Sequence, residues 1–358
     1  MNASEPTTVA RVDLRRFDDN LQAVRAQVDP AETMFVVKND AYGHGADVLV
    51  PRAVASGVGW IGALELETAI RMRTLVDDAT RVFAWLLSPR DDFAAARHAG
   101  IDLGVGDRDV LEAAAAAGVG RPMRVHLKID TGLNRNGVRA EHWPSFVARA
   151  AELQAEGRIV VEGVWSHISE ASDDDDDDAR GRFEAALASA AAAGVTPARR
   201  HLAASAAGFL RPEFRYDMVR IGAFVYGISP AGGPHEAELG ISPVMSLRTR
   251  VVDLRDGEAV LPIGGWHGVP RSAAAGVARG SGEAGVGVGI RGNRHPVLQV
   301  GSDWMTVAAL DVAQGDEAVL FGPGDDGEPT ATEWAEAIDT IGEEIVLKVD
   351  RRIPRVYH

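Results

Sequence analysis

The chain has no cysteine among its 358 residues. This absence excludes disulfide bonds, thiolate metal ligands and a cysteine nucleophile. The sequence also lacks any apolar run approaching the roughly 18 residues that a membrane-spanning helix needs. Its first residues, MNASEPTTVARVDLRR, do not show the basic-then-apolar order of a signal peptide. We therefore expect a cytoplasmic protein that does not contact a membrane.

Positive charge is scarce as well. Lysine and arginine total 37 against 52 aspartates and glutamates, which gives a net charge of −15. The phosphates of a nucleic acid would be repelled unless a local basic stripe compensated, and the sequence shows none. The acidic run Asp173–Asp178 lacks the ligand spacing of a calcium loop and its bidentate glutamate. We interpret this run as a solvated loop leading into a helix over 180–193, and we expect no metal.

One glycine-rich segment imitates a dinucleotide-binding motif. Residues 287–292 read GVGIRG, which fits the fingerprint G-x-G-x-x-G. That fingerprint has meaning only where a strand precedes it and a helix follows directly. Here Asn293-Arg-His-Pro296 follows, and proline at that place does not begin the required helix. We therefore reject a nucleotide site.

The pattern of hydrophobic residues predicts an α/β fold. Hydrophobic residues make up 46% of the chain and charged residues 25%, so a large core is available. Short β-rich runs alternate with amphipathic, alanine-rich stretches such as 65–75, 107–117, 141–156 and 180–193. The predicted strands are 33–37, 59–63, 81–86, 101–105, 124–129, 159–165, 199–203 and 219–225. Eight such units favour a (β/α)8 barrel, with a doubly wound sheet as the alternative.

The character of the chain changes after Pro230. Residues 243–310 are rich in valine, glycine and alternating patterns, with hairpin-like breaks at Asp256-Gly257 and Gly292-Asn293. We predict that residues 12–233 form the barrel and that residues 234–358 form a mainly β domain. The N-terminal strand, within residues 1–11, is expected to join that second domain.

Several polar residues follow the ends of predicted barrel strands, where a barrel carries its functional groups. These residues are Lys38, Arg135, His167 and Ser205, and a fifth, Arg220, opens the eighth predicted strand. Each one alone has a simpler explanation. A lysine at a strand end is usually a solvated surface charge, a histidine beside an apolar run is often a core residue, and an arginine beside an aspartate forms an ion pair. Five at equivalent positions favour a functional site.

The motifs around these residues resemble those of the alanine racemase family. VVKNDAYGHG, KIDTGLNRNGV, HLAASAAG, YDMVRIGAFVYG and RRIPRVY occur in the family's order and at its spacing, over nearly the whole chain. The resemblance implies a barrel that binds pyridoxal 5'-phosphate (PLP), followed by a β domain. It also implies a small amino-acid substrate and a homodimer whose active sites are shared between subunits.

The resemblance also implies roles for individual residues. Lys38 is expected to hold PLP as a Schiff base and to act as the base on one face of the substrate. Arg220 is expected to face the pyridine nitrogen, and because arginine keeps its proton, that nitrogen stays unprotonated and the ring is a weaker electron sink. The expected cofactor-binding residues are Lys38, Tyr42, Ser205, Arg220, Gly222, Ala223 and Tyr357.

The substrate pocket follows from the same resemblance. Arg135 is expected near the phenolic oxygen of the cofactor and the carboxylate of the substrate. The lysine that matches Lys128 is often carbamylated in the family and steadies this arginine. Met305, contributed by the second subunit, is expected to line the carboxylate pocket.

One departure from the family pattern concerns catalysis directly. The β domain of the family begins with GYADGYPR, whereas residues 264–271 here read GGWHGVPR. The tyrosine that serves as base on the second face is thus Gly265, next to the substrate. Racemisation needs a proton on each face, and general acid–base help is typically worth about 10²–10⁴-fold. Two further departures are Thr306 in place of an aspartate and Ala204 in place of an asparagine.

Three consequences of Gly265 stay open from the sequence. His267 could serve as a replacement base, although a solvent-facing loop histidine is the simpler interpretation. A water molecule relayed by His167 could protonate the second face. Alternatively, the freed space could admit a bulkier substrate, with His167 deprotonating a β-hydroxyl so that the Cα–Cβ bond breaks.

We therefore predict a PLP-dependent amino-acid racemase that acts at Cα through a Lys38 Schiff base, with altered activity or substrate range. The first alternative is a one-base PLP lyase or aldolase acting on β-hydroxy or α-substituted amino acids. The second alternative is a non-catalytic PLP-binding protein.

Overall fold

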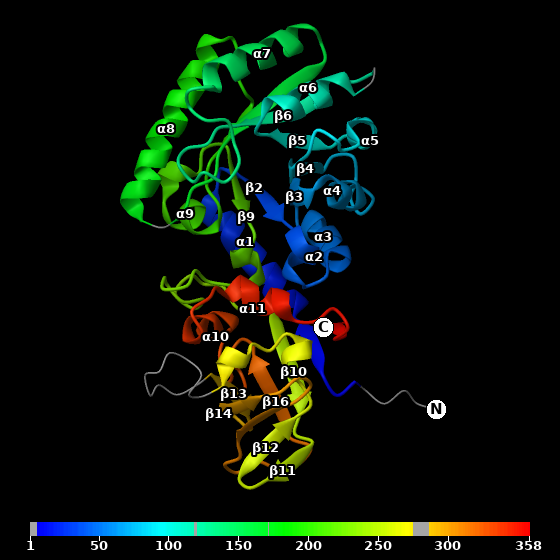
Figure 1. Cartoon of the computed structure of the whole chain (residues 1–358), viewed down its shortest axis with the longest axis vertical. Coiled ribbons are helices and arrows are strands. Elements are labelled where there is room, and N and C mark those ends of the chain that lie inside the picture. The colour runs from blue at the N-terminus through cyan, green and yellow to red at the C-terminus, as the bar shows by residue number, and fades with distance from the viewer. Residues whose placement is uncertain (1–5, 118–119, 171, 275–285) are drawn as a thin grey trace. The chain divides into compact units, whose positions relative to one another are not determined.

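The computed structural model describes residues 6–117, 120–170, 172–274 and 286–358 (Figure 1). The chain forms two compact units. The first, which we call the barrel unit, comprises Val24–Ala41 and Ala46–Gly222. The second, which we call the β unit, comprises Met1–Ala23, Tyr42–Gly45 and Ala223–His358.

Eight parallel strands make the sheet of the barrel unit, in the order β8-β7-β6-β5-β4-β3-β2-β9. They are β2 (Glu32–Val36), β3 (Trp60–Glu65), β4 (Arg81–Leu86), β5 (Asp102–Val105), β6 (Met123–Lys128), β7 (Ile159–Trp165), β8 (Arg199–His201) and β9 (Met218–Ile221). Backbone hydrogen bonds from Asp217 to Arg200 and from Arg220 to Ala203 bring the two ends of this sheet together. The predicted (β/α)8 barrel is confirmed, and the doubly wound alternative is wrong.

Helices cover the outside of these strands, as Figure 1 shows for α4 to α8. The barrel unit contains α2 (Lys38–Tyr42, which ends in the β unit), α3 (Ala46–Ala55), α4 (Leu66–Arg73), α5 (Phe93–Ala99), α6 (Arg108–Ala116), α7 (Trp143–Ala155), α8 (Asp173–Ala192), α9 (Ser205–Leu210) and η1 (Pro212–Phe214), while α1 (Leu14–Val28) crosses from one unit to the other. No helix in the described ranges is long and apolar enough to span a membrane.

The acidic run Asp173–Asp178 is helical, so our interpretation of it as a loop was wrong. Helix α8 begins at Asp173, and the Oγ of Ser172 accepts a hydrogen bond from the backbone N–H of Asp175. The first turn of a helix carries unpaired N–H groups and a partial positive charge, which stabilise carboxylates there. A run of acidic residues is thus compatible with a helix start, although its charge resembles that of a solvated loop.

Side chains inside the barrel follow the two-residue period of its strands. On β6, Arg124, His126 and Lys128 share one face, and their contacts are with other barrel-interior residues. The middle of the interior is a buried cluster of large side chains: Met34, Trp60, Phe83, Trp165 and Met218. Gly163 lies beside this cluster, where a Cβ atom would stand 2.2 Å from the Nδ1 of His126. Glycine therefore makes room for an imidazole inside the barrel.

The β unit is built on one nine-stranded sheet, in the order β11-β12-β15-β14-β13-β16-β10-β1-β17. Its strands are β1 (Val9–Val12), β10 (Met245–Arg250), β11 (Asp253–Arg255), β12 (Glu258–Leu261), β13 (Gly287–Ile290), β14 (Asn293–Val300), β15 (Met305–Ala308), β16 (Glu317–Phe321) and β17 (Arg355–Tyr357). Short helices accompany them: η2 (Ala223–Tyr226), η3 (Gly265–His267), η4 (Arg271–Ala273), α10 (Ala331–Ala337) and α11 (Gly342–Lys348). The predicted mainly β domain after the barrel is confirmed.

Strand pairing in the β unit involves both chain ends and two hairpins. Strand β1 pairs with β10 antiparallel and with β17 in parallel, so both chain ends contribute to the sheet. The breaks at Asp256-Gly257 and Gly292-Asn293 are hairpin turns. Because β13 turns directly into β14, a strand and not a helix follows the GVGIRG segment.

Candidate active site

Lys38 stands immediately after β2, at the start of an unusual turn. Asn39, Asp40 and Ala41 adopt the left-handed conformation, with φ values of 53°, 58° and 53°. For a residue other than glycine, adopting this left-handed conformation costs roughly 1–2 kcal/mol of free energy. The Oδ1 of Asp40 holds the turn by accepting a 2.9 Å hydrogen bond from the N–H of Ala46. Strain of this kind is typical of functional sites, because the surrounding structure must enforce it.

Arg220, on β9, is 6% exposed and contacts His167. Its Nη2 donates to the carbonyls of Ser166 and Leu202, at 2.8 and 3.0 Å, and lies 3.1 Å from the Nδ1 of His167. Burial and the charges of Arg220 and Arg135 hold the pKa of His167 well below its usual range. Because a guanidinium can only donate, Nδ1 accepts, and the single proton of the neutral imidazole is on Nε2.

Lys128 ends β6 and is 5% exposed. Its Nζ donates to the carbonyl of Arg135 at 3.4 Å and lies 4.6 Å from the ring centre of Trp165. Burial, followed by the charges of Arg220 and Arg135, lowers the pKa of Lys128 to about 8. At pH 7 roughly a tenth of such side chains are neutral and therefore nucleophilic.

The motif residues after the seventh and eighth barrel strands also meet. Ser205 begins α9, and its Oγ accepts a 3.2 Å hydrogen bond from the N–H of Gly222, which follows β9. Ala204, where the family has an asparagine, is the N-cap of α9 and provides no side-chain cap. Ala223 begins η2 in the β unit.

Two predicted cofactor-binding tyrosines belong to the β unit. The hydroxyl of Tyr357 donates to the carbonyl of His44 at 3.1 Å. A Cβ atom on Gly45 would stand 1.9 Å from this hydroxyl, so glycine is required there. Tyr42 packs against Tyr226 with ring centres 4.8 Å apart. Burial and the carboxylate of Glu343 raise the pKa of Tyr42, which keeps its hydroxyl protonated.

The segment that departs from the family pattern is a single 3₁₀ turn. Gly265 is exposed, and its N–H donates to the carbonyl of Gly301 at 2.9 Å. The Nδ1 of His267 accepts a 3.1 Å hydrogen bond from the N–H of Gly264, so this imidazole closes its own turn. That contact favours the simpler interpretation of His267 as a loop residue. Met305 is buried in β15, opposite Leu261 of β12.

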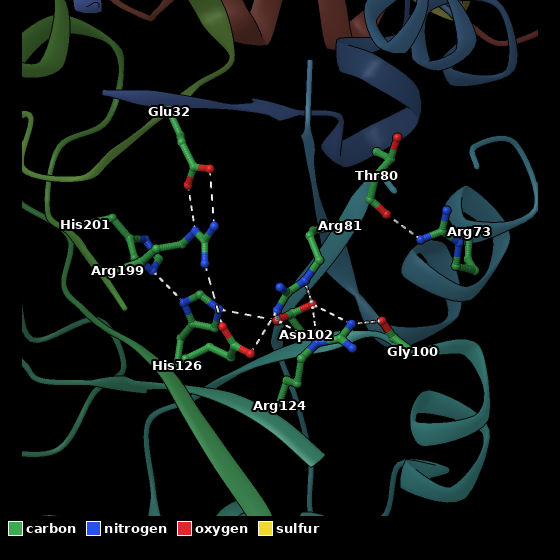
Figure 2. A network of polar contacts seen from close by, with 11 residues as sticks. Glu32, Arg73, Thr80, Arg81, Gly100, Asp102, Arg124, His126, Arg199 and His201 are labelled. Atoms are coloured by element: carbon green, nitrogen blue, oxygen red, sulfur yellow. Dashed lines mark hydrogen bonds and ion pairs between the residues drawn. The ribbon is translucent and has the colours of Figure 1, made fainter. Parts of the chain in front are cut away.

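Three buried polar residues that were not predicted from the sequence lie inside the barrel: Asp102, His126 and His201 (Figure 2). They continue from Arg220 toward the amino ends of the strands. A signal was present in β6, which reads MRVHLK and places a polar residue at every second position. In a strand with period two, that pattern puts a histidine on the same face as Lys128.

Lys38, after the first strand of a parallel barrel, acts on the charge of His167 together with two arginines and a second lysine, so the protein is a parallel barrel with a cationic site. Comparison with protein-family models identifies it further. Residues 12–230 match the alanine racemase N-terminal domain, and residues 244–357 match the alanine racemase C-terminal domain. The chain belongs to the alanine racemase family.

Relatives and solved structures agree with this assignment. Alanine racemase of Frankia casuarinae is 40% identical over 97% of this chain and 95% of its own length. The crystal structure of alanine racemase from Streptomyces lavendulae, a producer of D-cycloserine, superimposes with a TM-score of 0.91 at 34% identity, covering 99% and 98% of the two chains. Alanine racemase from Bartonella henselae, solved with covalently bound pyridoxal phosphate, shares the fold with a TM-score of 0.85 at 20% identity, covering 98% and 99%.

Proposed function

We propose that this protein is a PLP-dependent amino-acid racemase that acts at Cα through a Schiff base on Lys38, with altered activity or substrate range. The observation that carries the proposal is a group of cations around His167 in a chain of net charge −15. Each of these cations lowers the pKa of His167: Arg220, Arg135, Lys128 and Lys38. The phosphate and phenolic oxygen of PLP and the carboxylate of an amino acid are anionic, so they fit this group of charges.

The roles of the chain's own residues follow from their chemistry. When bound, PLP supplies a ring that accepts electron density from the α-carbon of the substrate. The amine of Lys38 exchanges the α-proton on one face. Arg220 would face the pyridine nitrogen as a donor and would leave it without a proton, since a guanidinium does not give its proton away. Arg135 binds the substrate carboxylate, and Met305 of a second copy lines the pocket for it.

The phosphate would be held by hydroxyl and backbone groups. Ser205 and Gly222, already 3.2 Å apart, supply a hydroxyl and an N–H from neighbouring strand ends. By the family resemblance, Tyr42, Ala223 and Tyr357 would complete this set, with Tyr42 as a donor because its hydroxyl is protonated. The small residues of this set, Ser205, Gly222 and Ala223, would let backbone N–H groups approach an anion.

The second face of the substrate has no side-chain base at Gly265. His167 carries its proton on Nε2 because Nδ1 accepts from Arg220. In this form Nε2 is a donor that orients the oxygen of a water molecule, and such a water would deliver the second proton. We expect racemisation to be slower than with a tyrosine at position 265, by a factor within the 10²–10⁴ typical of general acid–base catalysis.

A one-base lyase is the second candidate function, and the open space at Gly265 is the observation that favours it. Within the part of the chain that the structure describes, a Cβ atom there would have its nearest neighbour at 3.4 Å. Cleavage of a β-hydroxy amino acid would give glycine and an aldehyde, with the hydroxyl proton passing to a base. The tautomer of His167 opposes this route, because Nε2 already carries a proton.

Chiral amino-acid analysis separates the two candidates. Purified protein loaded with PLP is incubated with each enantiomer of alanine, serine and threonine. We expect the opposite enantiomer to appear. Glycine and aldehyde without inversion would instead establish the lyase, and no change in any substrate would establish a non-catalytic PLP-binding protein.

The variant Lys38→Ala tests the attachment of the cofactor. It should lose both turnover and the absorbance band of PLP bound to lysine. Persistence of that band in Lys38→Ala would show that the cofactor is held elsewhere. We further propose that the protein works as a cytoplasmic homodimer with shared active sites, as the family resemblance implies.

A further inference from the structure

A continuous line of polar contacts crosses the interior of the barrel from Arg220 to Asp102. The Nη1 of Arg220 lies 3.1 Å from the Nδ1 of His201. The Nε2 of His201 lies 2.9 Å from the Nδ1 of His126, and the Nε2 of His126 lies 3.5 Å from the Oδ1 of Asp102. Figure 2 shows the part of this line that runs from His201 to Asp102. None of the four side chains is more than 6% exposed.

The guanidinium of Arg220 determines which nitrogen donates and which accepts at each contact of this line. Because Arg220 can only donate, the Nδ1 of His201 accepts, and its proton is on Nε2. That proton points at the Nδ1 of His126, which must therefore accept. The remaining proton of His126 is on Nε2 and faces Asp102. Among the described residues, this nitrogen has no partner within hydrogen-bond geometry, and the carboxylate of Asp102, at 3.5 Å, is the polar group that it faces. The donors thus run in one direction, from the guanidinium to the carboxylate.

Asp102 is held in place as an anion by two arginines. Arg81 and Arg124 both donate to its carboxylate, Arg81 through Nε at 3.0 Å and Arg124 through Nη2 at 2.9 Å. Burial alone would raise the pKa of Asp102, but the nearby imidazole of His126 and the hydrogen bonds from Arg81 and Arg124 hold it well below its usual range. Arg81 also reaches Glu162 at 3.5 Å, so the carboxylate belongs to a larger network at the amino ends of the strands.

Neighbouring aromatic rings hold the imidazoles of His126 and His201 in their orientation. Trp165 stacks on His201 with ring centres 5.6 Å apart and planes at 6°. Phe83 meets both imidazoles edge to face. Gly163 leaves space for Nδ1 of His126, which a Cβ atom would approach to 2.2 Å. The barrel is therefore shaped around these imidazoles.

Arg220 is a buried cation, so its charge must be compensated by other groups of the protein. Among the residues that the structure describes, no carboxylate forms an ion pair with it; Glu170 acts on its charge at longer range. A buried cation is costly unless it is compensated. The line through two imidazoles connects it to the carboxylate of Asp102. We propose that Asp102 is a positioning residue for Arg220 and acts on it through His126 and His201.

The consequence for catalysis rests on the proposed function, in which Arg220 faces the pyridine nitrogen. A guanidinium held at fixed orientation presents its donor to that nitrogen in one geometry. If the line is cut, Nη1 of Arg220 loses its fixed partner while Nη2 keeps its contacts with Ser166, Leu202 and His167, so the guanidinium can tilt and the electronic state of the cofactor changes with it. Asp102 contacts neither substrate nor cofactor in this scheme.

Histidine tautomers in the wild-type protein provide the first test. The full chain, without PLP, is labelled with ¹⁵N in its ten histidines, and the signals are assigned with His126→Asn and His201→Asn. We expect His126 and His201 both to carry their proton on Nε2. A proton on Nδ1 of either residue would overturn the proposal. This measurement needs no cofactor, so it stands whether or not the proposed function does.

Two variants cut the line at its far end. Asp102→Asn removes the charge, and His126→Asn keeps an acceptor toward His201 but does not reach Asp102. The matched control is Asp217→Asn, which weakens the pairing with Arg200 and touches no member of the line. In the PLP-loaded enzyme we expect each test variant to lower kcat about ten-fold with little change in KM, the order expected for one lost hydrogen bond. The absorbance maximum of bound PLP should shift in parallel.

Combining the two substitutions separates positioning from a general structural role. If Asp102 acts through His126, the double variant loses no more than either single variant. Additive losses, or equal behaviour of Asp102→Asn and Asp217→Asn in kcat and absorbance, would overturn the proposal. Should Asp102→Asn fail to fold, His126→Asn carries the same test, because it leaves Arg81 and Arg124 paired with Asp102. Absence of a PLP band in the wild type would contradict the proposed function and leave the tautomer result intact.

Discussion

Gly265 is the residue at which this chain departs furthest from the chemistry of its family. Its N–H bonds to Gly301, and its Cβ position is open, with its first neighbour at 3.4 Å. Gly264 next to it is different, because a Cβ atom there would stand 2.7 Å from the carbonyl of Trp304. The turn therefore accepts a side chain at one of its two glycines and excludes it at the other.

This difference leads to a prediction for Gly265→Tyr. The variant should fold and should raise racemase activity at least ten-fold, because the phenol supplies the missing acid–base group. Chiral analysis of alanine incubations measures the rate. Gly265→Phe is the control, since it adds the ring without the hydroxyl and should not gain activity. Equal gains in both variants would mean that the ring, and not the proton, limits the reaction.

Lys128 leads to a second prediction, on stability against pH. Its pKa is lowered from 10.5 to about 8 in the folded protein, so the folded state binds fewer protons between these values than the unfolded state. Stability should therefore rise with pH through this window, by up to about 3 kcal/mol. Urea unfolding of the wild type and of Lys128→Met, in buffer free of carbon dioxide, measures the difference. A difference that does not change between pH 8 and 10.5 would contradict the lowered pKa.

At the scale of elements, helix α8 shows how a cap decides where a helix begins. The run Asp173–Asp178 is compatible both with a loop and with a helix start. Ser172 resolves this choice locally, because its Oγ accepts from the N–H of Asp175. Acidic side chains in the first turn then interact favourably with the partial positive charge of the helix.

The cap should contribute measurably to stability. Replacing Ser172 with alanine is expected to cost about 1 kcal/mol in the free energy of unfolding, since the N–H of Asp175 loses its acceptor. Ser189, in the interior of the same helix, provides the matched control. Ser189→Ala should change stability by less than about 0.5 kcal/mol, because alanine is the better helix former. Urea denaturation of both variants measures this. Equal effects would show that the side chain of Ser172 is not the cap.

At the scale of the whole molecule, the proposed shared active sites require two copies of the chain. Sedimentation equilibrium should give a mass twice the 38.0 kDa of one chain. Activity per subunit should fall on dilution in parallel with dissociation, because each site would lose Met305 of the second copy. Full activity in a monomer would contradict the shared site and leave the assignment of Lys38 untouched.

The distribution of charge also belongs to this scale. The chain carries a net charge of −15, yet Lys38, Lys128, Arg135 and Arg220 all act on His167. Their positive charge does not appear in the composition, because the residues are far apart in the sequence. An acidic protein can therefore contain a site for anionic ligands.

The sequence by itself determined the architecture and the positions of the motifs. Strands of period two alternating with amphipathic stretches predicted the barrel, because burial of one face or one stripe leaves a local pattern. Lys38, Arg135, His167 and Ser205 could be placed after strand ends, and Arg220 at the opening of the last barrel strand, for the same reason. Their catalytic and binding roles stay predictions.

Only the tertiary structure decided which side chains meet. His126 and His201 are 75 positions apart in the chain, yet their nitrogens lie 2.9 Å from each other. Their tautomers depend on the guanidinium of Arg220, and their position depends on space left by Gly163. The alternation in β6 indicates the face on which His126 lies, but neither local sequence indicates that it meets His201, because contacts between strands depend on register and closure of the barrel. The path from Arg220 to Asp102 became visible for that reason only in the fold.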